Sequence, residues 1–261
     1  LHYMDTHDPF MVHDSSGIGY ARARMKNPDP KQYKECMQQA YIAEIEHLDI
    51  YLGHLIEGLK KRGLYDDTIF VFVADHGEEF FDHGGWWHGL TLYEEMLRVP
   101  LLIKLPGKLQ GGVINNDLAR LVDIAPTLLQ QAGLEPGTDM VGQALCNSKG
   151  AFKNEGTAYS FAENDFEGNR QQAVRSLESA LIVANEDNPR GVKPVEFYTM
   201  TEDPCQQQNI AGNPDFSERV DAMKDIVAQY EKMILEDAPE PVLQQRIDPQ
   251  LQQQLESLGY L

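Results

Sequence analysis

The stretch that most constrains the fold is Val71-Phe72-Val73-Ala74-Asp75-His76-Gly77, a short apolar run that ends in a carboxylate, an imidazole and a glycine. An apolar run without alternation is typical of a buried strand and favours the interior of a parallel sheet. Open α/β sheets bind their ligands just beyond the carboxyl ends of the strands. Asp75 and His76 therefore fall where such a fold would hold a metal ion or a charged substrate.

Carboxylate and neutral imidazole are both ligands for divalent cations, and their adjacency lets Asp75 and His76 reach one ion. The alternative is that Asp75 caps a following helix while His76 packs or is solvated. A second cluster, His83-Gly84-Gly85-Trp86-Trp87-His88-Gly89, follows within a short loop. There His88 could donate a hydrogen bond to an anionic oxygen or relay a proton. For His83 and the two tryptophans we expect structural packing.

Further polar residues surround these two clusters in the sequence. His7 follows Leu1–Asp5, which looks like the end of a buried strand, so His7 could line the same crevice or be merely solvated. Arg98 could counter negative charge near the site, whereas for Lys104 a salt bridge or a surface role is expected. The neighbouring glutamates could accept hydrogen bonds from ligating histidines, although we expect most to be solvated; they are Glu78, Glu79, Glu94 and Glu95.

The chain is acidic, with a formal net charge of −19 over 261 residues. This charge argues against non-specific binding to nucleic acid or to anionic membranes, and a solvated acidic surface is its plainest explanation. No run of about twenty apolar residues occurs, so we expect no membrane span. The sequence opens at Leu1 without an initiator methionine or signal-peptide character, and we expect a fragment of a longer protein.

The spacing of apolar and turn residues predicts an α/β fold. Residues 1–150 are expected to form part of a large mixed sheet flanked by helices, residues 151–215 a small antiparallel sheet, and residues 216–261 a helical tail. The expected helices cover 31–62, 92–97 and a segment from Pro126 to near Gly133, and the expected strands cover 69–74, 99–104, 171–176, 179–183 and 195–198. In the first helix Ile45, Leu48, Leu52 and Leu55 fall on one face, and Gly63 is its expected stop.

Five passages resemble the carboxy-terminal portion of a sulfatase, within the alkaline phosphatase superfamily. They are Leu1–Phe10, Asp66–Glu78, His88–Leu101, Asp123–Leu129, and Tyr198–Gly212 together with Leu255–Leu261. The first is similar to the family's loop with an active-site histidine, and the second to its strand with two metal ligands. The third is similar to the segment with a substrate-contacting lysine or histidine. The second and third together are the most specific.

The resemblance implies a metal-dependent sulfuric ester hydrolase of the alkaline phosphatase-like fold. In that family a cysteine or serine is oxidised to formylglycine, whose hydrate attacks the sulfate ester. The resemblance implies that Asp75 and His76 bind a divalent cation, usually calcium, with manganese or zinc as alternatives. It implies that His7 and His88 contact the transferring group or the leaving oxygen. The implied partner is a small-molecule or glycan sulfate ester, and no nucleic acid.

The sequence also departs from the family pattern. The formylglycine motif, Cys-x-Pro-x-Arg or Ser-x-Pro-x-Arg, does not occur, and Cys36, Cys146 and Cys205 all lack its context. The family's paired metal-binding aspartates are missing too. We therefore expect half a metal site, completed by the missing amino-terminal half of the same protein, and no activity of this chain alone. Family habit favours a periplasmic, secreted or membrane-tethered parent.

Position 88 leaves the substrate open. His88 stands where many arylsulfatases have a lysine, which keeps a phosphoester or phosphonate hydrolase, or a phosphoglycerol-type transferase, as an alternative. A further alternative is a non-catalytic binding module that keeps the fold.

Overall fold

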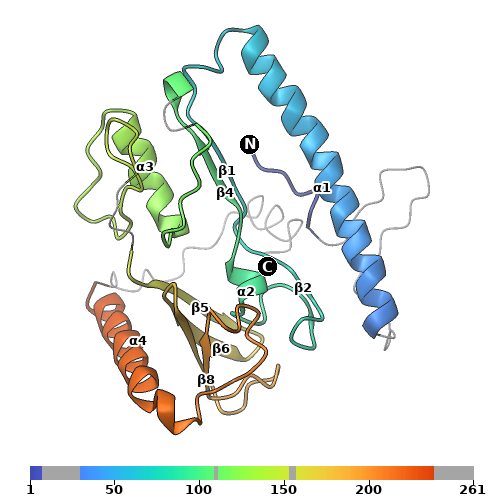
Figure 1. Ribbon diagram of the computed structural model, residues 1–261, viewed down its shortest axis with the longest axis vertical. Coiled ribbons are helices and arrows are strands. Elements are labelled where there is room, and N and C mark those ends of the chain that lie inside the picture. Colours follow the sequence, from blue (N-terminus) through green and yellow to red (C-terminus); the bar gives the residue numbers. More distant parts are fainter. Residues whose placement is uncertain (8–29, 109–110, 153–156, 238–261) are drawn as a thin grey trace, which may run out of the picture.

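The computed structural model describes residues 1–7, 30–108, 111–152 and 157–237. Its elements, seen in Figure 1, confirm the predicted α/β class and the small antiparallel sheet with its helix. The helices and strands are α1 (Pro30–Lys61), β1 (Phe70–Val73), β2 (Glu79–Phe80), β3 (Trp86–Trp87), α2 (Glu94–Leu97), β4 (Leu101–Lys104), α3 (Ile124–Gln131), β5 (Ser160–Phe166), β6 (Asn169–Arg175), β7 (Ser179–Ala184), β8 (Val195–Thr199) and α4 (Ser217–Asp237). None of the described helices has the length and apolarity needed to cross a membrane.

The long helix α1 agrees with the predicted segment 31–62, and it ends at the predicted glycine. Gly63 has φ +66°, and the N–H groups of Gly63 and Leu64 donate to the carbonyls of Lys60 and Leu59. This left-handed residue with backward hydrogen bonds is the usual glycine-based end of a helix. The end of the predicted tail, residues 238–261, lies outside the described residues.

The loop that carries the histidines contains a short hairpin, β2–β3, which the sequence did not predict. Phe80 of this hairpin is buried with Met37 of α1, and Trp86 and Trp87 pack against the same cluster. The Lys34 ammonium lies 2.7 Å from the Asp82 carboxylate and ties α1 to the hairpin turn. The predicted packing role of the tryptophans is therefore confirmed.

The strand that precedes Asp75 pairs differently from the expectation. β1 pairs with β4 in antiparallel register, Phe70 opposite Lys104 and Val73 opposite Leu101, so the parallel pairing that the apolar run favoured is wrong for these two strands. The chain between them turns back through the hairpin and α2, which reverses its direction. The expected strand at residues 1–4 is also wrong, since these residues form no strand and Leu1 is 96% exposed.

The second sheet has the order β5-β6-β7-β8, and all its neighbours are antiparallel. This sheet has one strand more than predicted, the polar strand β5. It pairs with β6, and a two-residue turn joins the two strands. The turn residues Glu167 and Gly168 both have positive φ, as a type I′ hairpin requires. The boundaries proposed near residues 150 and 215 stay predictions.

Both faces of this sheet are covered. On one face Val174, Leu181 and Phe197 are buried against three apolar residues of α4, which are Val220, Met223 and Val227. On the other face Ala173, Ala180, Ile182 and Tyr198 join a core cluster with Leu92 and Tyr93, which follow the histidine loop. The sheet therefore supports the segment on which the candidate site stands, and Figure 1 shows α2 beside it.

Candidate functional site

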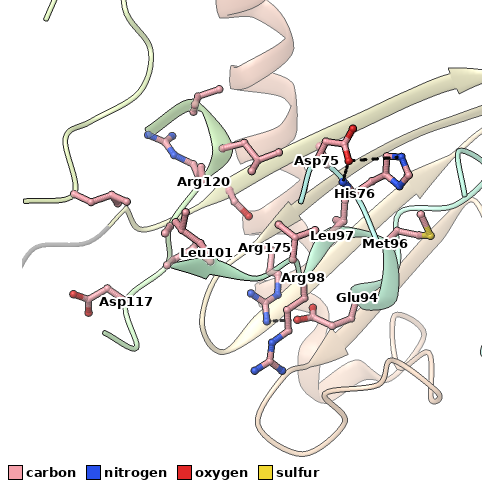
Figure 2. Close-up of a pocket in the computed structure, with 18 of the residues that line it drawn as sticks. Asp75, His76, Glu94, Met96, Leu97, Arg98, Leu101, Asp117, Arg120 and Arg175 are labelled. Carbon is pink, nitrogen blue, oxygen red and sulfur yellow. Dashed lines mark hydrogen bonds and ion pairs between the residues drawn. The ribbon is translucent and has the colours of Figure 1, made fainter. Parts of the chain in front are cut away.

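All the residues predicted for the site line one cavity of about 1660 Å³ beyond the end of β1. These are His7, Asp75, His76 and His88. Figure 2 shows the side chains of Asp75 and His76 close together, with Arg98, Arg175 and Glu94 elsewhere in the same lining. The prediction that His7 could line the same crevice as Asp75 and His76 agrees with this geometry.

The turn after β1 is fixed by a close backbone approach at Gly77. Its N–H donates to the carbonyl of Met96 in α2 at 2.9 Å. A Cβ added to Gly77 would lie 1.8 Å from the Glu95 carbonyl oxygen, so no other residue fits without moving α2. Glycine is thus required here for space. This contact holds Asp75 and His76 at the mouth of the cavity.

The hydrogen bonds of His76 determine which ring nitrogen can bind a cation. Nδ1 lies 2.9 Å from the carbonyl oxygen of Gly77, and because a carbonyl only accepts, Nδ1 carries the proton. The Nε2 lone pair is then available, and Nε2 lies 3.9 Å from Oδ1 of Asp75. A carbonyl that fixes the tautomer in this way is the usual outer partner of a metal-binding histidine.

The separation of these two atoms fits a shared ion. A carboxylate oxygen and an imidazole nitrogen that bind one ion at about 2.0–2.5 Å, with angles of roughly 90–120° between them, lie about 3–4 Å apart. The observed 3.9 Å falls in this range. The alternative, that Asp75 caps a following helix, does not describe this turn. Oδ1 of Asp75 accepts a hydrogen bond from the N–H of His76 at 3.0 Å, but no helix follows directly. Across the described part of the chain, no three His, Cys, Asp or Glu side chains are grouped to hold a metal ion.

Three imidazoles meet at the cavity. The ring of His88 stacks near that of His76, with centroids 4.3 Å apart, and lies edge-on to that of His7 at 4.8 Å. Nδ1 of His88 is 3.2 Å from both carboxylate oxygens of Glu78, so Nδ1–H donates to this carboxylate. This hydrogen bond orients the His88 ring, which suits a group that binds an anionic oxygen or moves a proton.

The expectation that the nearby glutamates are solvated is wrong. Glu78, Glu79 and Glu94 are buried, and each has a cationic or hydrogen-bonding partner. Glu79 is 1% exposed and accepts from Arg190 at 2.9 Å and from the N–H of Gly85 at 2.8 Å. Buried carboxylates persist only when they are paired in this way.

The structural role expected for His83 agrees with its contacts. Its Nδ1 lies 2.7 Å from Oε1 of Glu95, and its Nε2 lies 2.9 Å from the carbonyl of Gln206. Its ring stacks on Tyr93 with centroids 3.7 Å apart. Nδ1 faces a carboxylate and Nε2 faces a carbonyl, so the imidazolium form can donate to both, although Nε2 also lies 3.3 Å from the amide nitrogen of Gln207. Burial by itself lowers the pKa of His83, but the hydrogen bonds to Glu95 and Gln206 outweigh it and the pKa is raised.

We expect this pair to make stability depend on pH. Because the folded pKa of His83 lies above its ordinary value of 6.5, its contribution is fully present below pH 6.5 and is lost as the pH rises through the folded pKa. In thermal unfolding of the full-length protein, His83→Gln should lower Tm most at acidic pH and progressively less at higher pH. The exposed control His54→Gln should leave Tm unchanged, and a His83→Gln effect that grows with pH would contradict the assignment.

Two arginines of the cavity lining act on the buried Glu94. Arg175 on β6 donates to Oε1 of Glu94 at 2.8 Å, as the dashed line in Figure 2 shows. Burial raises the pKa of the Glu94 carboxyl, although Arg175 and Arg98 act in the opposite direction. Arg98 is exposed and lines the cavity, as predicted. Lys104 instead donates to the carbonyls of Tyr65, Asp66 and Thr68, so neither a salt bridge nor a surface role describes it.

Several residues that hold the site were missed by the sequence analysis. The histidine loop and α2 are bound by side chains of the C-terminal sheet region, namely Asn164, Gln171, Arg175, Arg190 and Gln206. These partners lie 75 to 112 residues away along the chain. No local motif signals such contacts.

Two family models match this chain. The model described as sulfatase matches residues 1–134, and the model described as N-sulphoglucosamine sulphohydrolase, C-terminal, matches residues 82–233.

Similar proteins agree with these matches. The chain is 28% identical to the N-acetylglucosamine-6-O-sulfatase of Bacteroides thetaiotaomicron, over 80% of this chain and 38% of that protein. It is 31% identical to the lipoteichoic acid synthase of Staphylococcus aureus, over 60% of this chain and 29% of that protein. A protein solved in complex with its substrate D-glucosamine-2-N,6-O-disulfate superposes with a TM-score of 0.68 at 25% identity, over 81% of this chain and 43% of that one. The chain thus spans less than half the length of each of these relatives.

Proposed function

The chain belongs to the sulfatase family, and from this premise we propose that the protein that contains it hydrolyses sulfate esters with the help of a divalent cation. The observation that carries the proposal is the convergence of Asp75, His76, His88 and His7 on one cavity beyond β1. A carboxylate and imidazoles of this kind can bind a cation, contact an anionic group and move a proton.

Asp75 Oδ1 and His76 Nε2 are the atoms proposed to hold the cation. Their 3.9 Å separation and the proton on Nδ1 of His76 support this role. A bound divalent ion would neutralise charge on the sulfuryl oxygens and favour the deprotonated nucleophile. Family resemblance favours calcium, whereas the nitrogen ligand keeps manganese and zinc as alternatives.

His88 and His7 are proposed to contact the sulfate ester. The Glu78 carboxylate accepts from Nδ1–H of His88 and orients its ring, and in the imidazolium form Nε2–H can donate to a sulfate oxygen or give a proton to the leaving oxygen. His7, 4.8 Å away between ring centroids, is placed to contact the same group. The nucleophile, expected to be formylglycine, would come from a segment outside residues 1–261, since its motif does not occur here. We therefore propose that this chain alone is inactive.

The substrate class follows from the same comparisons, and we propose a sulfated sugar or another small sulfate ester. Of the relatives named above, one is an N-acetylglucosamine-6-O-sulfatase and another was solved in complex with D-glucosamine-2-N,6-O-disulfate. Phosphoryl chemistry is the second candidate, favoured by the 31% identity to lipoteichoic acid synthase and by His88 at the position of a lysine.

Turnover by the full-length protein separates the two candidates. We expect 4-nitrophenyl sulfate to be hydrolysed with a higher kcat/KM than 4-nitrophenyl phosphate. The two esters share a leaving group, so the ratio of their kcat/KM values reports which group the enzyme transfers. Preference for the phosphate would replace the sulfatase proposal with the phosphoryl one. Absence of both activities in a preparation with bound metal would refute both.

A further inference from the structure

The edge strand β5 forms part of the wall of the cavity that contains His88. Ala162, Asn164 and Phe166, which alternate along the strand and so share one face of it, line this cavity together with Ser160, Phe161 and Glu163. Ala162 packs against the core cluster of Leu92 and Tyr93, which places this face toward the segment after His88. β5 is the first strand of its sheet and pairs with β6 alone among the described strands.

Hydrogen bonds hold this wall at a fixed distance from His88. The amide Nδ2 of Asn164 donates to the carbonyl of Gly89 at 3.0 Å, directly after His88. One residue further on, Gln171 of β6 donates from Nε2 to the carbonyl of Leu90 at 2.8 Å. The loop and the strands must therefore move together.

Phe166 presents an apolar ring inside this polar site. It is 52% exposed although it lines the cavity, and its Cδ1 lies 4.0 Å from the place where a Cβ on Gly89 would stand. Gly89 has φ +81°, a conformation that favours glycine. The loop backbone therefore keeps a residue without a side chain next to the Phe166 ring. An exposed aromatic ring gains free energy when an apolar surface covers it.

We propose that Phe166 is a stacking platform for the pyranose ring of a sulfated sugar, whose sulfate ester reaches toward His88. The inference rests on the proposed function and names the substrate class of that site. A pyranose has a face of C–H groups, whose slight positive charge suits the negative face of an aromatic ring. The cavity is continuous from Phe166 to His88, and a relative of this fold binds a glucosamine disulfate.

Asn164 completes the subsite. Its Nδ2 is engaged by Gly89, and among the described residues no donor to its Oδ1 is recorded. This oxygen accepts a hydrogen bond from a sugar hydroxyl, while Phe166 holds the ring. An aromatic residue with a few fixed polar groups is the usual composition of a small-molecule site.

Kinetics of the full-length protein on two sulfate esters test the platform. Phe166→Ala should raise KM for glucosamine 6-sulfate by about three- to tenfold, and leave kcat/KM for the acyclic 2-aminoethyl sulfate unchanged. Phe166→Tyr should restore the sugar value because it keeps the ring. Leu134→Ala, which removes a 58% exposed apolar side chain outside the cavity lining, is the matched control and should change neither ester.

Saturation-transfer NMR with glucosamine 6-sulfate gives a readout that does not need turnover. The wild type should saturate the ring C–H protons strongly, and Phe166→Ala should lose this signal. Equal kinetic losses on both esters, or ring saturation unchanged in Phe166→Ala, would overturn the platform while leaving the sulfatase proposal intact. If the wild type cleaved neither ester, the proposed function would fail, and the NMR result would still decide whether a sugar ring contacts Phe166.

Discussion

Replacing Asp75 with alanine in the full-length protein is expected to lower kcat/KM for a sulfate ester by on the order of a thousandfold, together with the content of bound divalent metal. The carboxylate would supply one of the two ligand atoms proposed above, with Oδ1 only 3.9 Å from Nε2 of His76. Its loss removes both a ligand and a charge that balances the cation. Metal per protein, measured by elemental analysis after gel filtration, is the primary readout, and activity is the second.

Asp117→Ala is the control for this variant. Asp117 also lines the cavity and is exposed, so its replacement changes the net charge by the same amount. It should leave metal content unchanged and alter activity by less than about threefold, since exposed charges interact weakly. Wild-type metal stoichiometry in Asp75→Ala would remove Asp75 from the ligand set.

Replacing His88 with alanine should lower kcat by about a hundred- to a thousandfold, and it should also lower Tm because the buried Glu78 carboxylate loses this partner. A group that donates to an anionic oxygen or moves a proton in the transition state contributes about this factor. The His88 side chain is 20% exposed and is bonded to Glu78, so its removal leaves that buried carboxylate without this partner but creates no large void. Steady-state kinetics with thermal unfolding of the same samples measures both effects.

Glu78→Gln separates orientation from chemistry at His88. The amide can still accept from Nδ1–H but carries no charge, so kcat should fall less than in His88→Ala and the pH profile of kcat should shift. His54→Ala, an exposed histidine outside the cavity lining, should behave as the wild type. Normal kinetics of His88→Ala would reduce His88 to a loop-packing residue.

The elements found from the sequence are those with a strong local pattern. The apolar spacing of Ile45, Leu48, Leu52 and Leu55 and the stop at Gly63 predicted α1 almost to its ends. The strand β5 was missed because Ser-Phe-Ala-Glu-Asn-Asp-Phe carries few apolar residues, and its stability comes from pairing with β6. The antiparallel pairing of β1 with β4 was missed because strand direction is set by the path of the chain between strands.

In the candidate site too, a local sequence pattern identified some residues, whereas others are recognised only from tertiary contacts. Asp75 and His76 were identified because they end an apolar run and precede Gly77, and His88 because it stands between two tryptophans and Gly89. Their supports were not, since Asn164 and Gln171 reach the loop across at least 75 residues of chain. The burial of Glu78 was not expected either, because a carboxylate is paired only through tertiary contacts that no local pattern records.

A crystal structure of the full-length protein with manganese, located by its anomalous scattering, tests the central claim most directly. The account predicts one ion bound by Oδ1 or Oδ2 of Asp75 and by Nε2 of His76, each at about 2.0–2.5 Å, with Nδ1 of His76 still bonded to the Gly77 carbonyl. An ion held elsewhere, with these two side chains turned away from it, would contradict the account.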